Sequence, residues 1–367
     1  MLFRSKKIYS VGGWVRDHYL REIHHLDLPK GDRDWVIVGA TPEEMLREGF
    51  LSVGKDFPVF LHPKTHEEYA LARLERKVAP GYHGFEFNTA PTVTLEEDLS
   101  RRDLTINAMA MADGQLFDPY GGLDDIRQCR LRHVSLAFKE DPVRILRVAR
   151  FNARFPDFTV AEETMELMRE MVVNEEADAL VAERVFQEFR KGLMENRPSL
   201  MIDILLQCGL WQRLFGVITI TPSLLSRLDD CASHGFSLAE RFAVLLGDLN
   251  DTTFSDRFFD SLRAPTEVTD LVSLAIQTNS QIKNAKRPED VLNALERCDV
   301  LRRPERFISL LKALSTKIEL HTDFWLECMH RISTINAGAI AKAQTDKSMI
   351  PVAIRQARLE AIKEFMS

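Results

Sequence analysis

The pattern of apolar residues changes near residue 140, and this change is the strongest constraint on the fold. Before it, two short runs rich in isoleucine and valine, 7–11 and 35–38, stand between glycine or charged residues, as strands do. Residues 68–73 form a third strand-like segment, which is short and mostly apolar with charged ends. Residues 14–22 follow a Gly-Gly turn with helical spacing. After it, apolar residues recur at helical spacing over 142–154, 162–171, 182–193 and 200–208. The sequence therefore predicts an α+β protein, with a small mixed α/β head followed by an all-helical remainder.

A chain of 367 residues is too long for one compact core, so we expect two or more domains. We place a head at 1–139, a helical neck at 140–210, and a helical body and tail at 211–367. Residues 79–84 are rich in glycine and proline, which predicts a loop.

Composition excludes several classes of protein. No apolar run approaches the roughly 20 residues of a membrane span, and the N-terminus lacks the apolar stretch of a signal peptide, so we expect a cytoplasmic protein with no membrane partner. The five cysteines are scattered without CxxC spacing, which argues against zinc and against a disulfide framework. A net charge of −7 disfavours non-specific binding of nucleic acid but leaves room for a basic groove.

Asp32 and Asp34 form a carboxylate pair directly before an apolar run. If a strand begins here, side chains two apart point to the same face, with Cα atoms about 6.6 Å apart. Hard oxygen ligands of this kind suit Mg²⁺, which could activate an attacking hydroxyl and neutralise a departing pyrophosphate. Taken alone, an Asp-x-Asp triplet is also typical of a solvated strand end.

Gly12 and Gly13 stand between a predicted strand and a predicted helix. Glycine lets the backbone approach a triphosphate, a helix N-terminus offers free N–H groups, and Arg16 would add a charge-assisted contact. An ordinary strand-to-helix turn is the alternative.

Arg144, Arg147, Arg150 and Arg154 recur at three- and four-residue spacing, which places them along one helical stripe. Such a stripe is unfavourable unless anions face it, and a triphosphate or an RNA backbone would supply them. A solvated basic face is the alternative. Pro142 suits the first position of this helix, with Asp141 as its N-cap.

Four segments together resemble the bacterial class II CCA-adding enzymes, of the tRNA nucleotidyltransferase and poly(A) polymerase family. They are Val-Gly-Gly-Trp-Val-Arg-Asp at 11–17, Asp-Arg-Asp-Trp-Val-Ile-Val-Gly-Ala-Thr-Pro at 32–42, Gly-Lys-Asp-Phe-Pro-Val-Phe-Leu at 54–61 and Arg-Arg-Asp-Leu-Thr-Ile-Asn-Ala at 101–108. The likeness covers about the first 155 residues and implies a polymerase-β-like nucleotidyltransferase head.

The resemblance also implies roles for individual residues. Asp32 and Asp34 would bind the catalytic Mg²⁺, and Gly13 and Arg16 would contact the incoming nucleotide. Arg102, with Asp103 as its partner, would recognise the sugar, unless the two form a purely structural pair. Asp141 and Arg144 would select the base, and Arg147 and Arg150 would bind the phosphates or the flank of the nucleotide. Glu68 stands where the superfamily often places a third carboxylate, although a salt-bridged strand residue is the alternative.

The implied reaction is addition and repair of the 3′-terminal CCA of tRNA from CTP and ATP, with tandem CCACCA tagging of unstable tRNAs as a further expectation. The helical tail is expected to grip the tRNA elbow. Residues 116–125 and 182–188 match family segments that we interpret as architecture. Some relatives carry an HD phosphohydrolase domain, but Gly247 stands before Asp248 where its metal-binding histidine would be, so we expect no phosphatase activity.

Three alternatives remain open from the sequence. A poly(A) polymerase of the same family is one, although residues 56–61 lack the basic run typical of that branch. An enzyme that adds only CC or only A is the second. An inactive RNA-binding relative is the third, and the presence of both aspartates argues against it.

Overall fold

The computed structural model describes residues 6–53, 59–77, 85–216, 218–249 and 251–367. The predicted loop at 79–84 and motif residues 54–58 lie outside the described residues. The chain divides into two compact units, the first made of Met1–Glu195 and Leu200–Leu214, the second of Asn196–Ser199 and Phe215–Ser367. The division into head, neck and tail stays a prediction.

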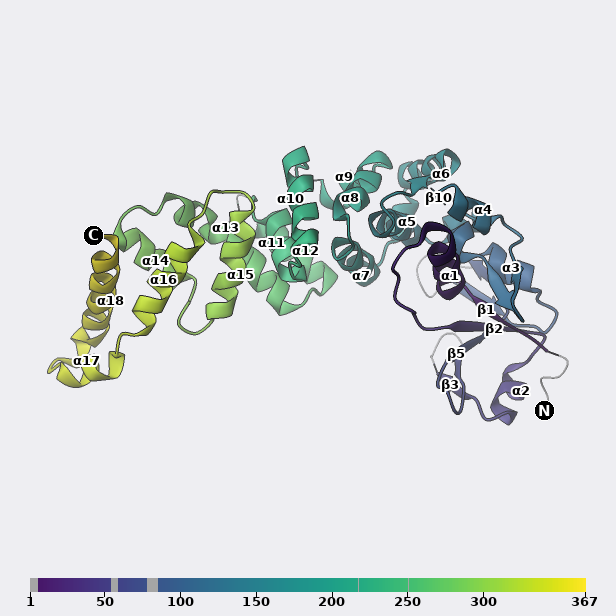
Figure 1. The fold of residues 1–367 in the computed structure, drawn as a ribbon, viewed down its shortest axis with the longest axis horizontal. Helices are drawn as coiled ribbons and strands as arrows, with labels where there is room; N and C mark the ends of the chain where they lie inside the picture. The colour runs from purple at the N-terminus through teal and green to yellow at the C-terminus, as the bar shows by residue number, and fades with distance from the viewer. Residues whose placement is uncertain (1–5, 54–58, 78–84, 217, 250) are drawn as a thin grey trace. The chain divides into compact units, whose positions relative to one another are not determined.

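A seven-stranded mixed sheet in the order β3-β4-β5-β2-β1-β8-β9 lies in the first unit (Figure 1). Its strands are β1 (Lys7–Val11), β2 (Asp34–Val38), β3 (Leu51–Val53), β4 (Val59–Leu61), β5 (Glu68–Leu71), β8 (Ala110–Ala112) and β9 (Gln115–Phe117). Strands β2 and β5 pair in parallel, whereas the other neighbouring pairs are antiparallel. The three strand segments predicted from the sequence are confirmed.

The sheet separates two apolar cores because successive side chains of a strand point to opposite faces. Val36 of β2 packs with Tyr9 and Val11, whereas the next residue, Ile37, packs with Phe60 on the other side. The run Trp-Val-Ile-Val is therefore apolar throughout, as expected for a strand buried on both faces.

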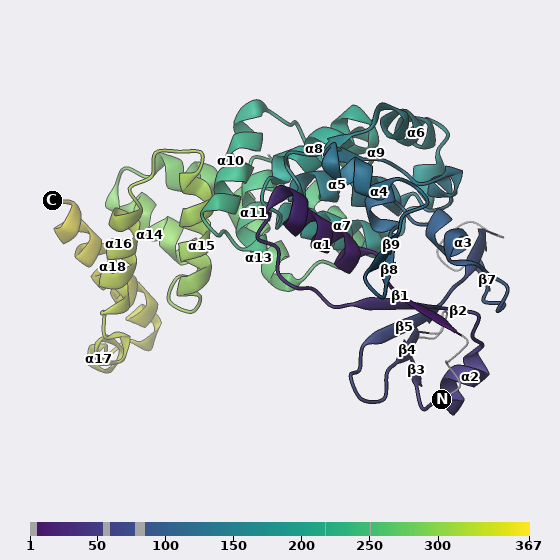
Figure 2. The ribbon, with the colours of Figure 1, turned by 45° about the vertical axis from the view of Figure 1, so that its right-hand side comes forward.

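Helices cover the sheet and continue beyond it. Figures 1 and 2 both show α1, α4 and α5 on the same side of strands β1 and β2. The helices up to residue 215 are α1 (Gly13–His24), α2 (Pro42–Arg47), α3 (Leu95–Ser100), η2 (Thr105–Asn107), α4 (Gly122–Arg127), η3 (Leu136–Glu140), α5 (Val143–Arg154), α6 (Glu162–Val173), η4 (Glu176–Ala179), α7 (Ala182–Leu193), α8 (Pro198–Gln207) and α9 (Leu210–Phe215). Two small pairings, β6 (Leu74–Lys77) with β7 (Phe85–Asn88) and β10 (Arg130–Leu131) with β11 (Thr159–Val160), complete this part.

The described residues from 218 onward form helices and no strand, as the sequence predicted. These helices are α10 (Pro222–Ser233), α11 (Leu238–Leu246), α12 (Thr253–Leu262), α13 (Thr266–Asn284), α14 (Pro288–Arg297), α15 (Pro304–Ser315), α16 (Thr322–Ser333), α17 (Ala337–Ala343), η5 (Lys347–Met349) and α18 (Ile350–Met366). Across the described ranges, we find no helix with the length and apolar character needed to cross a membrane. The α+β fold class is confirmed.

The strand register brings the predicted site residues to one edge of the sheet. Val11, the last residue of β1, pairs with Asp34, the first residue of β2. Because β2 and β5 run parallel with Trp35 opposite Tyr69, Asp34 stands opposite Glu68 at the start of β5. Gly12 follows Val11 directly and leads into α1. The Gly-Gly turn and the carboxylates therefore meet at this edge.

Candidate active site

A hollow of about 660 Å³ opens at this edge of the sheet, between the strands and helices α1, α5 and α7. It is lined by Val11, Gly12, Gly13, Arg16, Asp34, Trp35, Val36, Val59, Glu68, Tyr69, Ala70, Arg73, Arg101, Arg102, Asp103, Asn107, Asp141, Arg144, Arg147, Arg150, Phe151, Arg154 and Arg184. All the predicted site residues except Asp32 line it. Nine arginines against four carboxylates make it suited to a polyanion.

The Gly-Gly turn has the geometry of an anion cradle. Gly12 has φ +67°, a conformation that favours glycine, and a Cβ at this position would lie 3.0 Å from the Arg102 guanidinium. No side chain caps the N-terminus of the twelve-residue helix α1, and its first turn holds no acidic residue. Its N–H groups and the helix dipole are therefore available to a phosphate.

Arg16, one turn into α1, is buried and already oriented by the protein. Its Nε donates to Asp17 (2.8 Å) and its Nη1 to the Asn107 side chain (2.6 Å). Its guanidinium also lies over the Phe151 ring, 5.1 Å from the centroid. These contacts pre-organise the arginine, so little of its conformational freedom is left to lose on binding.

Asp34 lacks a protein cation at bonding distance. Within the described residues, Asp32, Asp34 and Glu68 make no hydrogen bond or ion pair through their carboxylates. Burial raises the pKa of the Asp34 carboxyl, and the charges of Glu68 and Asp32 raise it further, against the opposing effect of Arg102. Carboxylates that lie close together without forming an ion pair are a feature of cation sites.

Asp32 lies just before β2 and lines a second hollow of about 580 Å³, which shares Asp34 and Glu68 with the first. No group of three or more metal-binding side chains is preformed among the residues that the structure describes. The donors present are carboxylate oxygens, a set that fits a hard divalent cation whose coordination is completed by substrate phosphates.

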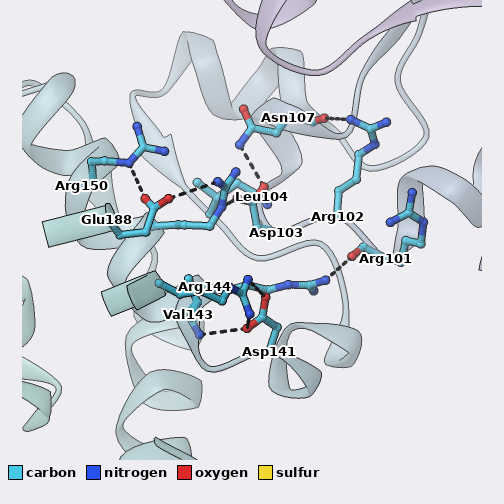
Figure 3. Close-up of polar contacts among 12 residues, drawn as sticks. Arg101, Arg102, Asp103, Leu104, Asn107, Asp141, Val143, Arg144, Arg150 and Glu188 are labelled. Atoms are coloured by element: carbon cyan, nitrogen blue, oxygen red, sulfur yellow. Dashed lines mark hydrogen bonds and ion pairs between the residues drawn. The ribbon is translucent and has the colours of Figure 1, made fainter. Parts of the chain in front are cut away.

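The arginine stripe of α5 faces carboxylates of the protein itself. Arg147 donates to Asp103 (2.7 Å), and Arg150 donates to Glu188 of α7 (2.6 Å), as Figure 3 shows for the latter pair. Arg154 lies 3.5 Å from Asp17. The expectation that a ligand supplies the facing anions was therefore incomplete, because Asp103 and acidic residues of α1 and α7 partly neutralise the stripe.

The expected pairing of Arg102 with Asp103 is not what the structure shows. Arg102 contacts Asp98 (3.3 Å) and the Asn107 carbonyl (3.4 Å), and its Nε is buried without a partner among the described residues. Asp103 instead accepts from Arg147 and the Leu104 N–H, and from the Asn107 side chain, a contact that Figure 3 shows. The Arg147 charge and these hydrogen bonds overcome burial and hold the pKa of Asp103 well below its ordinary value. Adjacent residues point apart here, so sequence neighbours do not become partners.

Asp141 and Arg144 lie at the start of α5, with both side chains held by the protein. The helix begins at Val143, one residue later than predicted, and Asp141 accepts from the Val143 N–H (3.2 Å). Arg144 donates to the backbone carbonyls of Ala137 (2.9 Å) and Arg101 (2.7 Å). These contacts fix where each group projects into the hollow.

Arg184 of α7 was missed as a site residue. It grips Asp141 with two hydrogen bonds, of 3.0 and 2.7 Å, in the bidentate arrangement that fits a carboxylate. Glu188, one turn further on, bridges Arg150 and Arg147. The sequence interpretation assigned 182–188 to architecture, but the i, i+4 spacing of Arg184 and Glu188 shows that one face of α7 serves the hollow.

Comparisons with known proteins agree with this geometry. Residues 8–132 match the model of the poly A polymerase head domain, and residues 157–221 match that of the probable RNA and SrmB-binding site of polymerase A. The chain is 48% identical to the CCA-adding enzyme of Bordetella pertussis, over 97% of this chain and 96% of the relative. The chain belongs to the family of CCA-adding enzymes. The resemblance seen in the sequence is thereby confirmed.

A second relative differs in length. The multifunctional CCA protein of Azoarcus sp. (strain BH72) is 47% identical over 97% of both chains, yet the alignment spans 404 positions. This chain has only 367 residues. The alignment is longer than the chain, so the relative carries segments that this chain lacks.

Solved structures of CCA-adding enzymes share the fold. A complex with CTP has a TM-score of 0.69 at 23% identity, covering 97% of this chain and 87% of that chain. The Thermotoga maritima CCA-adding enzyme complexed with tRNA has a TM-score of 0.66 at 20% identity, covering 98% and 89%. CCA-adding nucleotidyltransferases generally use a divalent metal ion, which the carboxylate donors Asp32, Asp34 and Glu68 would suit.

Proposed function

We propose that this chain adds and repairs the 3′-terminal CCA of tRNA, taking CTP and ATP and releasing pyrophosphate. The observation that carries the proposal is one hollow lined by the Gly12-Gly13 turn, by nine arginines, and by Asp34 and Glu68, whose carboxylates form no ion pair in the described residues. A nucleoside triphosphate needs both halves, because its phosphates require cations and its reacting phosphorus requires a bound metal. Relatives 47–48% identical over nearly their whole length are named for CCA addition.

The carboxylates are assigned to metal binding. Asp32 and Asp34 would hold Mg²⁺, and Glu68 opposite Asp34 is placed to assist. When bound, the ion would lower the pKa of the attacking 3′-hydroxyl and neutralise charge on the leaving pyrophosphate. The protein contributes two carboxylates whose mutual repulsion is relieved by a cation.

The remaining residues are assigned to the nucleotide. Gly13 and the N-terminus of α1 would receive the phosphates, with Arg16 beside them. Arg102 has a buried Nε without a partner in the described ranges, which supports a contact with a ligand or an ordered water. Asp103 supports this wall through Arg147 rather than through Arg102. Arg150, held by Glu188, would act on the phosphates or the flank of the nucleotide.

Base selection is assigned to Asp141 and Arg144 at the start of α5. A carboxylate accepts hydrogen bonds and a guanidinium donates them, so together they can pair with the Watson–Crick edge of cytosine or adenine. Arg184 fixes Asp141, and two backbone carbonyls fix Arg144, which gives the pair a defined spacing. The helical residues 211–367 would bind the tRNA, and tandem CCACCA tagging stays a prediction.

One assay tests the proposal. The full chain is incubated with Mg²⁺, labelled CTP or ATP, and tRNA that lacks one, two or three terminal nucleotides. We expect each substrate to be extended to CCA and no further. A long A-tail would indicate a poly(A) polymerase, a halt after CC or addition of A alone would indicate a partial enzyme, and no addition would indicate an inactive relative. The matched control uses EDTA in place of Mg²⁺.

A further inference from the structure

Arg33 separates Asp32 from Asp34 in the sequence, yet its charge lies against aromatic rings. The guanidinium carbon is 3.9 Å from the centroid of the Trp14 ring and 5.0 Å from that of Trp35. Within the described ranges Arg33 makes no ion pair with a carboxylate. In an extended segment the side chain between two aspartates points to the opposite face, and here that face offers aromatic rings to the Arg33 guanidinium.

Each of the two tryptophans also stacks on a second ring. Trp14, in the first turn of α1, stacks on His18 with ring planes 3° apart, and Trp35 of β2 stacks on Tyr69 of β5 with planes 9° apart. Tyr69 is buried in the core of the sheet. The surfaces that receive the Arg33 guanidinium are therefore fixed by a helix and by two paired strands.

This arrangement matters because Arg33 could otherwise compete for the carboxylates. A guanidinium at ion-pair distance from Asp32 or Asp34 would neutralise a charge that a divalent cation needs. The charges that act most on the Asp34 carboxyl are those of Arg102, Glu68 and Asp32, and Arg33 is not among them. Both aspartates and Arg33 line the second hollow beside Trp14, so the guanidinium lies in the same hollow as the carboxylates that it must not pair with.

We propose that Trp14 and Trp35 hold Arg33 in cation–π contact away from Asp32 and Asp34, so that the carboxylate pair stays free for a divalent cation. Trp14 and Trp35 are thus positioning residues, which act on the metal site through Arg33. The inference rests on the metal-binding role given to Asp32 and Asp34 under the proposed function.

Binding of Mn²⁺ alone to the full chain, followed by electron paramagnetic resonance, tests this directly. Trp14→Ala releases Arg33, and we expect the Kd for Mn²⁺ to rise about threefold to tenfold, the range of one exposed cation–π or ion-pair contact. Trp14→Phe keeps a ring face and should bind Mn²⁺ almost as wild type does. The double variant Trp14→Ala/Arg33→Gln should recover wild-type affinity, because the competing cation is gone.

The matched control is Trp14→Ala/Arg47→Gln, which removes an exposed arginine of α2 instead and should not restore binding. Wild-type affinity in Trp14→Ala, or no recovery in the Arg33 double variant, would overturn the inference. If Trp14→Ala does not fold, the comparison of Arg33→Lys with Arg33→Gln tests the inference instead. The lysine ammonium stacks poorly on a ring but pairs with carboxylates, whereas glutamine carries no charge. We then expect weaker Mn²⁺ binding in Arg33→Lys than in Arg33→Gln, and equal affinities would contradict the idea.

These outcomes are separable from those of the proposed function. A wild-type chain that binds Mn²⁺ but does not complete CCA overturns the assigned reaction and leaves the role of Trp14 standing. A chain that completes CCA but shows no dependence of Mn²⁺ affinity on Trp14 overturns only the inference. A wild-type chain that binds no Mn²⁺ overturns the inference and the metal role of Asp32 and Asp34 together.

Discussion

Asp34 in the first unit and Asp248 in the second are both carboxylates at positions where family members are expected to hold metal, and the protein treats them in opposite ways. Asp34 has no ion pair in the described ranges, and burial with two neighbouring carboxylates raises its pKa. Asp248 lies 3.2 Å from Arg227 and also forms an ion pair with Lys317. The Asp34 carboxylate is open to an added cation, whereas Asp248 joins helix α10 and the turn after α15 to the end of α11.

The residue before Asp248 completes the contrast. Gly247 ends α11 where that helix packs against α13. A Cβ on Gly247 would overlap the carbonyl of Ala243 and lie 3.4 Å from the Cβ of Ala275. An imidazole therefore has no room here without movement of a helix. Asp34 and Asp248 therefore differ in whether a protein cation lies at ion-pair distance, and this difference supports a metal role for Asp34 and none for Asp248.

The largest effect is expected from Asp34→Asn. The amide removes the charge that holds the metal, so CCA addition should fall by at least about 10³-fold. Stability should stay level or rise slightly, because a raised pKa means that folding disfavours the ionised carboxyl at neutral pH. Initial rates of CTP addition and thermal unfolding at pH 7 measure the two effects. Retained activity, or a large drop in Tm, would show that Asp34 is architectural like Asp248.

Asp103→Asn tests a carboxylate that lies in the same hollow but is paired. It removes the nearer of the two carboxylates that face Arg147 and leaves only Glu188 at 3.8 Å, and we expect a loss of about 2–3 kcal/mol in the free energy of unfolding. Because the folded pKa of Asp103 is depressed, its contribution is present above its ordinary pKa and is lost as pH falls through the folded value. Urea unfolding should therefore show the full difference from wild type at pH 7 and a smaller one only below about pH 4.

If the free energy of unfolding is unchanged in Asp103→Asn, Asp103 does not stabilise the fold, and its role would then be in ligand binding, as proposed for Asp34. The control is Arg127→Gln on the exposed face of α4, whose pair with Asp124 is solvated and should contribute less than about 1 kcal/mol.

Which charged side chains form ion pairs within the protein, and which do not, could not be predicted from the sequence. Strand and helix positions followed from periodicity, because β2 is apolar on both faces and α5 and α7 have clear apolar stripes. The edge where Gly12 and Asp34 meet comes from the structure, because the pairing of Val11 with Asp34 was not predicted. The partners of charged residues did not follow: Arg102 pairs with Asp98, and Asp141 with Arg184 from 43 residues away. Such choices depend on how α5 packs against α7, which no local pattern encodes.

Arg144→Gln asks whether an arginine tied to the backbone can also read a base. Arg144 already donates to two carbonyls, yet it lines the hollow beside Asp141. We expect the preference for CTP over ATP on a tRNA ending at position 73 to fall about tenfold, the loss of one or two oriented hydrogen bonds. The ratio of kcat/KM for the two nucleotides measures it. An equal decrease in kcat/KM for both nucleotides, together with a lower Tm, would assign Arg144 to structure alone. The comparison variant is Arg184→Gln, which keeps Asp141 but removes the two hydrogen bonds that hold its carboxylate.

Asp248→Asn gives the smallest expected effect and closes the contrast with Asp34. Both of its cations lie on partly exposed parts of the second unit, so removal of the charge should cost about 1 kcal/mol or less. High salt should shrink that cost, because solvent ions screen exposed pairs. CCA addition should be unchanged, and neither wild type nor variant should show Mn²⁺ binding that depends on this residue. A loss of Mn²⁺ affinity in Asp248→Asn would mean that the ion pairs with Arg227 and Lys317 give way to a metal, and that carboxylates paired within the protein can still serve a cation.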